Sequence, residues 1–101
     1  MKESLMEILA CPICKSHPLK LHIYQRTEEE ISEGVILCSE CERWYPIIDE
    51  IPHMLPDDLR KKKDDTEFLK KWKQKIPEKI LREGKPHRLA DRKKRKQKLK
   101  N

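Results

Sequence analysis

Apolar and polar side chains alternate along residues 19–24, which is the period of a half-buried β-strand. The acidic stretch at residues 27–34 is predicted to form a loop, from which a second strand starts at Ile31. Residues 35–37 then complete a β-hairpin. The side chains expected on the buried face of the first strand are Leu19, Leu21 and Ile23.

A short helix of one or two turns is predicted before this hairpin, over residues 4–10. Ser4 and Glu7 have the three-residue spacing of a capping box, in which the two side chains satisfy free backbone N–H groups at the start of a helix. The apolar residues that would share one face of this helix are Leu5, Ile8 and Leu9.

Two apolar runs, at residues 44–48 and 51–56, are separated by only two acidic residues. A strand that is apolar on both sides normally lies between two covering layers, and a domain of this size is expected to have no second layer. Pro46 and Pro52 lack a backbone N–H, which favours edge positions in a sheet. Two interpretations stay open: the side chains fold back over the neighbouring cysteines, or they form an exposed apolar edge that a partner covers.

From residue 57 the sequence is rich in basic residues, and its apolar residues recur at helical spacing. Asp57 and Asp58 are suitable helix caps, and Pro77 interrupts the apolar pattern and starts a second short helix that ends near Gly84. The apolar residues at helical spacing are Phe68, Leu69, Trp72 and Ile76 in the first helix, with Ile80 and Leu81 in the second.

All four cysteines occur in two Cys-x-x-Cys pairs, Cys11 with Cys14 and Cys38 with Cys41. This pattern is typical of a tetrahedral structural zinc site, whose four thiolates leave no open position for catalysis. Two disulfides or a redox Cys-x-x-Cys are the alternatives. Disulfides are disfavoured because nothing in the chain is typical of a secreted protein, and a redox motif would need a βαβ context. His17 is a fifth candidate ligand, but the four cysteines already complete the shell.

These patterns predict a small α+β protein in three parts. Residues 1–58 form a partner-binding head, a zinc-ribbon-like β-hairpin held together by the cysteine site. Residues 59–84 form an amphipathic basic helical segment, and residues 85–101 form a basic disordered tail. Charge divides in the same way, because residues 1–56 carry 5 Lys/Arg and 10 Asp/Glu, whereas residues 57–101 carry 19 and 8. The acidic head argues against a ribbon that itself grips nucleic acid.

Composition also limits the classes of function. No apolar run is long enough to span a membrane, and Lys2, Glu3 and Glu7 make the first residues unlike a signal peptide, so we expect a cytoplasmic protein. Two glycines are too few for a glycine-rich loop that holds a nucleotide or S-adenosylmethionine. The four histidines are scattered without paired carboxylates, so we expect no enzyme activity of the chain's own.

Four segments in this order resemble one family: Leu-Ala-Cys-Pro-Ile-Cys at residues 9–14, Cys-x-x-Cys at 38–41, Trp-Tyr-Pro-Ile at 44–47 and Asp-Glu-Ile-Pro-His-Met-Leu at 49–55. They resemble the small zinc-ribbon activator subunit of methyltransferases that act on tRNA, rRNA and translation release factor. The resemblance covers about residues 4–58.

The resemblance implies a non-catalytic subunit that activates and stabilises a Rossmann-like methyltransferase. Such a subunit binds along the edge of the enzyme, extends its sheet and covers an apolar surface, while the enzyme supplies the S-adenosylmethionine site and the chemistry. The implied zinc ligands are Cys11, Cys14, Cys38 and Cys41. The implied partner-binding residues are Tyr45, Pro46, Ile47, Ile48, Ile51, Pro52 and Met54.

Two departures from the family pattern stand out. Glu50 occupies a position where members often have glycine, so the turn there must form without glycine's freedom to adopt positive φ. The 23 residues between the cysteine pairs leave no room for the helical insertion of eukaryotic members, which indicates the minimal prokaryotic form, favouring an archaeal one.

The main rival interpretation is a zinc ribbon that binds RNA or the ribosome through its basic tail. Residues 59–101 lie outside the resemblance, so their role is not implied by it. Trp72 would be available to stack on bases, although its helical spacing with Phe68 and Ile76 favours a place in the apolar seam. The candidate phosphate-binding residues of the tail are Arg92, Lys93, Lys94, Arg95 and Lys96.

Overall fold

A computed structural model of the chain describes residues 1–89. Within this part, none of the helices has the length and apolar character needed to cross a membrane. In chain order the elements are η1 (Glu3–Glu7), β1 (Lys20–Arg26), β2 (Ile31–Leu37), β3 (Trp44–Ile48), β4 (Ile51–Pro52), η2 (Asp57–Leu59), α1 (Lys62–Lys71) and α2 (Glu78–Glu83).

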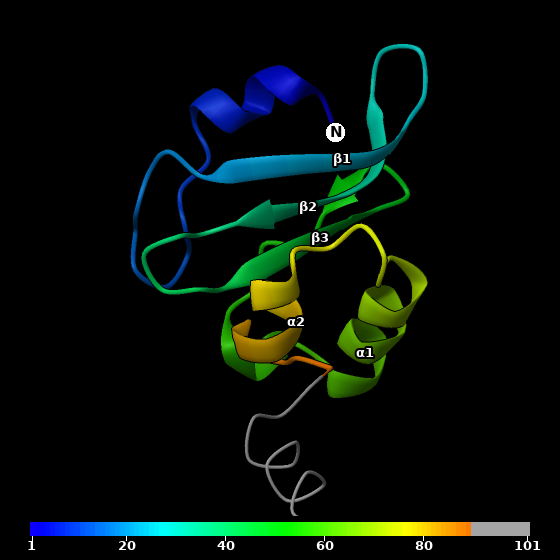
Figure 1. The fold of residues 1–101 in the computed structure, drawn as a ribbon. Coiled ribbons are helices and arrows are strands. Elements are labelled where there is room, and N and C mark those ends of the chain that lie inside the picture. The colour runs from blue at the N-terminus through cyan, green and yellow to red at the C-terminus, as the bar shows by residue number, and fades with distance from the viewer. Residues whose placement is uncertain (90–101) are drawn as a thin grey trace, which may run out of the picture.

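The four strands form one antiparallel sheet in the order β1-β2-β3-β4, so each strand pairs with its neighbour in the sequence (Figure 1). β1 and β2 are the predicted hairpin. β2 already begins at Ile31, so the loop is shorter than residues 27–34 and the strand extends beyond residues 35–37. The two apolar runs become β3 and β4, and β4 lies at the edge of the sheet as its proline predicted.

The N-terminal segment covers one face of the sheet, and η1 lies alongside β1 (Figure 1). The predicted capping box is wrong. η1 is a 3₁₀ helix that starts one residue earlier, at Glu3, and Lys2 is its N-cap without a side-chain hydrogen bond. Ser4 therefore lies inside the helix, where it cannot cap its start. The buried residues on this face are Met1, Cys11, Leu19, Ile31, Ile36, Cys38, Tyr45 and Ile47.

α1 and α2 cover the opposite face, so the expectation that the sheet has no second layer is wrong (Figure 1). The helical segment closes back on β2 and β3, and the Phe68 ring stacks on the Trp44 indole with centroids 5.8 Å apart. α2 ends near Gly84 as predicted, where a Cβ would stand 2.9 Å from Cδ1 of Trp44. The buried residues on this face are Val35, Leu37, Trp44, Phe68, Leu69, Ile76 and Ile80.

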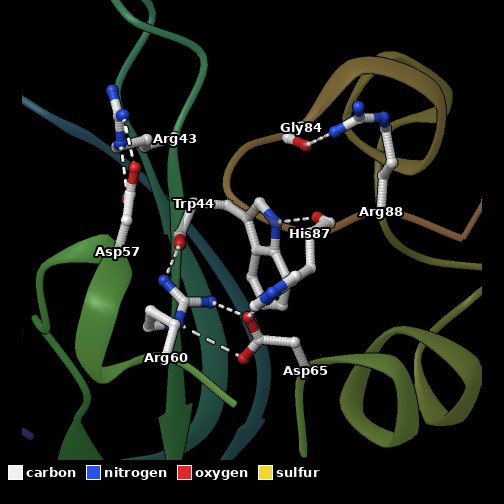
Figure 2. Close-up of polar contacts among 8 residues, drawn as sticks. All are labelled: Arg43, Trp44, Asp57, Arg60, Asp65, Gly84, His87 and Arg88. Atoms are coloured by element: carbon white, nitrogen blue, oxygen red, sulfur yellow. Dashed lines mark hydrogen bonds and ion pairs between the residues drawn. The ribbon is translucent and has the colours of Figure 1, made fainter. Parts of the chain in front are cut away.

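A buried polar network joins the two layers around Trp44 (Figure 2). Arg60 donates to the Trp44 carbonyl at 2.8 Å, and its guanidinium lies 4.7 Å from the centroid of the Trp44 ring. Arg60 also pairs with Asp65 at 2.9 Å, and the second partner of Asp65 is Nδ1 of His87 at 2.7 Å. The indole N–H of Trp44 donates to the His87 carbonyl at 2.8 Å. One strand residue thereby holds α1 and the segment after α2 in place.

The segment after α2 is also tied to the backbone at the start of β3. The Trp44 N–H donates to the Lys85 carbonyl at 3.1 Å, and the Lys85 N–H donates to the Glu42 carbonyl at 3.0 Å. Nearby, the Arg43 guanidinium forms two hydrogen bonds to Asp57, at 2.8 and 2.6 Å, which hold the pKa of Asp57 below its usual value (Figure 2). The Arg43 side chain therefore fixes η2 against the sheet, and backbone hydrogen bonds fix the chain near residue 85.

The turn between β3 and β4 consists of two acidic residues with positive φ, Asp49 at 50° and Glu50 at 70°. Two-residue hairpin turns favour this conformation at both central positions, and glycine usually supplies it. The side chains here adopt it without glycine, at a conformational cost of about 1 kcal/mol for each residue.

Glu50→Gly is therefore expected to stabilise the protein by about 0.5–1 kcal/mol. Glycine adopts the left-handed conformation without strain, and the greater backbone entropy of glycine in the unfolded state offsets part of this gain. Urea denaturation of the zinc-loaded protein measures the change. Glu28→Gly is the control, since Glu28 has no positive φ. Equal effects of the two substitutions would contradict this account of the turn.

Asp65→Ala is expected to lower the free energy of unfolding by about 3 kcal/mol or more, because it leaves the buried Arg60 guanidinium without its carboxylate. Asp64→Ala provides a matched control one residue away, where the side chain is exposed and the expected change is within about 0.5 kcal/mol. If the two variants unfold at the same urea concentration, the network does not stabilise the contact between the layers.

Candidate metal centre and partner surface

The four predicted cysteines meet at one point, although they come from two separate turns. All four Sγ atoms lie within 4.8 Å of one another, with Cys11 3.6 Å from Cys41 and Cys14 3.5 Å from Cys38. Cys11 and Cys38 are buried, whereas Cys14 is exposed. The β1–β2 hairpin brings the pairs together, because β1 leaves the first turn and β2 returns the chain to the second.

These sulfur positions fit a four-coordinate zinc ion. With Zn–S bonds of about 2.3 Å, the edges of an S₄ tetrahedron are about 3.8 Å long, close to the observed separations. A disulfide would need about 2.05 Å between sulfurs, so the distances do not fit the disulfide alternative. The sheet is antiparallel throughout the described residues, so the βαβ context of a redox motif is also missing there.

Both cysteine turns have the same backbone conformation. The N–H of Lys15 donates to the Cys11 carbonyl at 2.9 Å, and the N–H of Glu42 donates to the Cys38 carbonyl at 2.9 Å. The residue after each Cys-x-x-Cys pair has a positive φ, 67° at Lys15 and 62° at Glu42. Sequence reasoning missed this feature, because glycine is the usual signal of positive φ and neither position has it.

The pKa values of the thiols differ with their surroundings. Hydrogen bonding to the Ser16 side chain and backbone lowers the pKa of the exposed Cys14 to about 6, whereas burial raises the pKa of Cys38 to about 12. Because zinc binds the thiolate, metal binding must displace the proton of Cys38. His17 takes no place among the ligands, since its Nδ1 lies 2.7 Å from the Leu9 carbonyl.

The predicted partner-binding residues fall into two groups. Tyr45, Pro46 and Ile47 are buried within the chain itself, which leaves them little surface for a partner. The reason is the alternation of β3: Tyr45 and Ile47 face the cysteine side, and the Tyr45 hydroxyl lies 3.1 Å from Cys11 Sγ. Pro46 faces the helical layer. Tyr45 and Ile47 therefore follow the fold-back interpretation, whereas Pro46 is covered from the helical side.

Ile48 and Ile51 are exposed, the latter by 58%, and Pro52 and Met54 are half-buried. Two further apolar residues, Leu55 and Leu59, are exposed close to them in the chain. Neither was among the predicted partner-binding residues, although Leu55 lies within the second apolar run and Leu59 follows it closely. We call Ile48, Ile51, Pro52, Met54, Leu55 and Leu59 the apolar edge.

A groove of about 380 Å³ lies beside the apolar edge, with α1 as its other wall. Its apolar lining comes from Pro46, Ile48, Leu55, Leu59 and Phe68. Charged residues of both signs also line it, among them Asp64, Glu67, Lys61 and Lys71. The second layer therefore leaves one part of the β3–β4 hairpin uncovered and forms a concave surface beside it.

Comparison with known proteins agrees with this geometry. The family model of the Trm112p-like proteins matches residues 2–50. A UPF0434 protein of Nitrosococcus oceani is 42% identical over 60 residues, which are 59% of this chain and 86% of that protein. A UPF0434 protein of Methylobacillus flagellatus is 46% identical over 61 residues, with 60% and 87% of the two chains covered. This chain belongs to the Trm112p-like family.

A solved structure is similar to this Trm112p-like chain as well. It is the complex between the Haloferax volcanii Trm112 methyltransferase activator and a candidate methyltransferase. The match has 47% sequence identity and a TM-score of 0.55, and it covers 59% of this chain and 100% of the other. The predicted α+β fold with its cysteine cluster is thereby confirmed.

The Trm112p-like match ends before the helical layer begins. The family model stops at residue 50, whereas α1 starts at Lys62. About half of the chain lies outside the family model and about two fifths outside the matches to the relatives and the solved structure, so the function of this part has to be argued from its own residues. The candidate RNA-binding residues Arg92, Lys93, Lys94, Arg95 and Lys96 lie outside the described residues.

Cys38→Ser is expected to abolish stoichiometric zinc binding and to unfold the sheet, because metal binding to such sites contributes about 10 kcal/mol or more to folding. Elemental analysis gives the zinc content, and near-ultraviolet circular dichroism reports the packing of Trp44 and Tyr45. Ser39→Ala changes an exposed neighbour and should keep both zinc and signal. A folded, zinc-free Cys38→Ser protein would show that the cysteine cluster is no structural metal site.

Proposed function

We propose that this chain is the non-catalytic, activating and stabilising subunit of an S-adenosylmethionine-dependent methyltransferase. One observation carries the proposal: the chain matches the whole length of a chain from a methyltransferase activator complex at 47% identity. The catalytic subunit would be a Rossmann-like enzyme that holds S-adenosylmethionine and performs the chemistry. From the family resemblance, the substrates would be tRNA, rRNA or translation release factor, and the compartment would be the cytoplasm.

The apolar edge supports a protein partner as the ligand of this surface. Each exposed apolar side chain that a partner buries contributes roughly 1.5–3 kcal/mol, so a few such residues supply most of the affinity of a stable complex. Ile48, Leu55 and Leu59 line the same groove, and the pairing of Ile48 with Ile51 places these two side chains on one face of the β3–β4 hairpin. Pro52 pairs with Ile47 and Met54 packs against the cysteine-side core, so these two lie toward the other face. Exposed apolar side chains gathered beside a groove are typical of a protein-binding surface.

Burial of the apolar edge is proposed to contribute more to the affinity for the partner than strand addition does. β4 pairs through only two residues, and one of them is Pro52, which has no N–H to donate to an added strand. The other edge of the sheet, β1, carries the charged residues Lys20 and Arg26, which discourage pairing with another strand. A strand added at β4 would therefore form few hydrogen bonds. Shape complementarity and apolar contact would determine which partner binds and how it is oriented.

The metal site would act on this surface through β3. The second cysteine turn ends at Cys41 and β3 begins at Trp44, so a metal bound there fixes the start of the strand that leads to the apolar edge. The contact between Tyr45 and Cys11 connects the same strand to the first cysteine turn. Zinc is thus proposed to hold the partner surface in register without taking part in the reaction.

Ile51→Asp is expected to weaken the heterodimer by at least about 100-fold, since it removes roughly 1.5–3 kcal/mol of apolar burial and places a carboxylate in the interface. Co-expression with the candidate catalytic subunit, followed by size-exclusion chromatography and titration of the purified partners, measures the loss. S-adenosylmethionine binding by the complex then separates activation, which changes affinity or turnover, from stabilisation, which changes only the active fraction.

Ile8→Asp is the matched control, because Ile8 is 76% exposed and lies on η1's C-cap, away from the apolar edge. This variant should retain the partner. If Ile8→Asp dissociates the complex and Ile51→Asp does not, the partner surface is on the cysteine side. If the catalytic subunit is equally stable and binds S-adenosylmethionine equally well without this chain, the proposed function fails.

A further inference from the structure

The two layers of the protein carry opposite charge. Residues 1–59, which contain the sheet and the cysteine turns, hold 5 Lys/Arg and 12 Asp/Glu. Residues 60–89, which contain α1 and α2, hold 12 Lys/Arg and 5 Asp/Glu. The helical layer is therefore a basic surface attached to an acidic one, and an anionic ligand would be attracted to the helices and repelled by the sheet.

A group of basic residues lies where α1 ends. Lys70 and Lys71 are the last residues of the helix, and Lys73 and Lys75 follow in the turn toward α2. All four are exposed, and residues 70–75 together line a hollow of about 300 Å³. We call Lys70, Lys73 and Lys75 the lysine turn.

Among residues 1–89, the ammonium groups of the lysine turn make no hydrogen bond or ion pair. Lys71 differs, because it binds both carboxylate oxygens of Glu33, at 2.9 and 3.0 Å. The pairing of Lys71 keeps one lysine against the sheet and leaves the other three to solvent. Three unneutralised positive charges within six residues are suited to bind a polyanion.

The backbone of the lysine turn is anchored on both sides. The indole N–H of Trp72 donates to Glu33 at 3.1 Å, its ring packs on Tyr24 with centroids 5.1 Å apart, and Ile76 is buried beneath the turn. The Tyr24 hydroxyl also donates to the Lys75 carbonyl at 3.4 Å. Fixed Cα positions reduce the entropy that the lysines would lose on binding a ligand.

Trp72 itself is engaged, which corrects the suggestion that it stacks on bases. Tyr24 packs against its ring, and the Lys71 ammonium lies 5.2 Å from the ring centroid. The turn can therefore contact phosphates but offers no free aromatic platform, so binding would not depend on base sequence.

A lipid surface fits the helical layer less well than a nucleic acid does. A helix that lies in a membrane interface inserts an apolar face, but the apolar residues of this layer, Phe68, Leu69 and Ile76, are buried against the sheet. Three unpaired lysines on one anchored turn instead suit the repeated phosphates of a nucleic-acid backbone. We propose that the lysine turn is an RNA-backbone contact site of this protein, separate from the apolar edge.

The test is titration of the full-length, zinc-loaded chain with a labelled oligouridine at salt concentrations between about 50 and 200 mM. Lys70, Lys73 and Lys75 are replaced together by Gln, which keeps side-chain length and polarity. Loss of three phosphate contacts is expected to lower affinity at least tenfold at low salt and to reduce the slope of log K against log salt by about 2. Replacement of the exposed Lys2, Lys15 and Lys20 by Gln is the control for net charge. It should change the RNA affinity and the salt slope much less than the first triple variant does.

Three results would overturn the proposal. The first is equal loss in the two triple variants, which would indicate a general charge effect. The second is loss only when Arg92, Lys93, Lys94, Arg95 and Lys96 are neutralised, which would assign RNA binding to those residues alone. The third is tighter lysine-dependent binding to phosphatidylserine vesicles than to RNA, which would indicate a lipid surface. Heterodimer formation does not enter these measurements, so failure here and failure of the proposed function are distinguishable.

Discussion

Burial of β2 and β3 on both faces is the constraint on which the rest of this structure depends. Alternate residues of each strand face opposite cores, so Val35 and Leu37 pack with Trp44 under the helices, whereas Ile36 packs with Ile47 on the other face. A sheet of four short strands can bury neither face alone. The chain therefore needs cover from three separate places: the N-terminal segment, the cysteine turns and the helical layer.

These covers are coupled through β3. Tyr45 contacts Cys11 on one face, and the Trp44 carbonyl on the same strand accepts a hydrogen bond from Arg60, whose partner is Asp65. Metal binding at one end of the strand and helix packing along it thus stabilise the same few residues. The other end of β3 emerges from both covers at Ile48, and the apolar edge starts there. The uncovered surface is a consequence of where the covering segments stop.

Local sequence signals predicted the elements well, because strand alternation, cysteine spacing and the Phe68–Ile76 seam depend on residues close together in the chain. Long-range packing was less accessible. The apolar seam was recognised, but nothing in its spacing showed that it closes on β3, so Pro46 was a candidate for the partner surface although the helical layer covers it. Arg60 and Asp65 were equally hidden, since a buried ion pair within a lysine-rich run has the composition of a solvated surface.

The helical layer explains how one small chain can present two unlike surfaces. Its inner side must be apolar to cover Trp44, but its outer side is constrained only to remain soluble, so lysines there cost the fold little. Gathering lysines in one layer adds repulsion among like charges, which the pairing of Lys71 with Glu33 on the sheet partly offsets. The segment that completes the core can therefore carry a charged surface of its own without disturbing the apolar edge beside it.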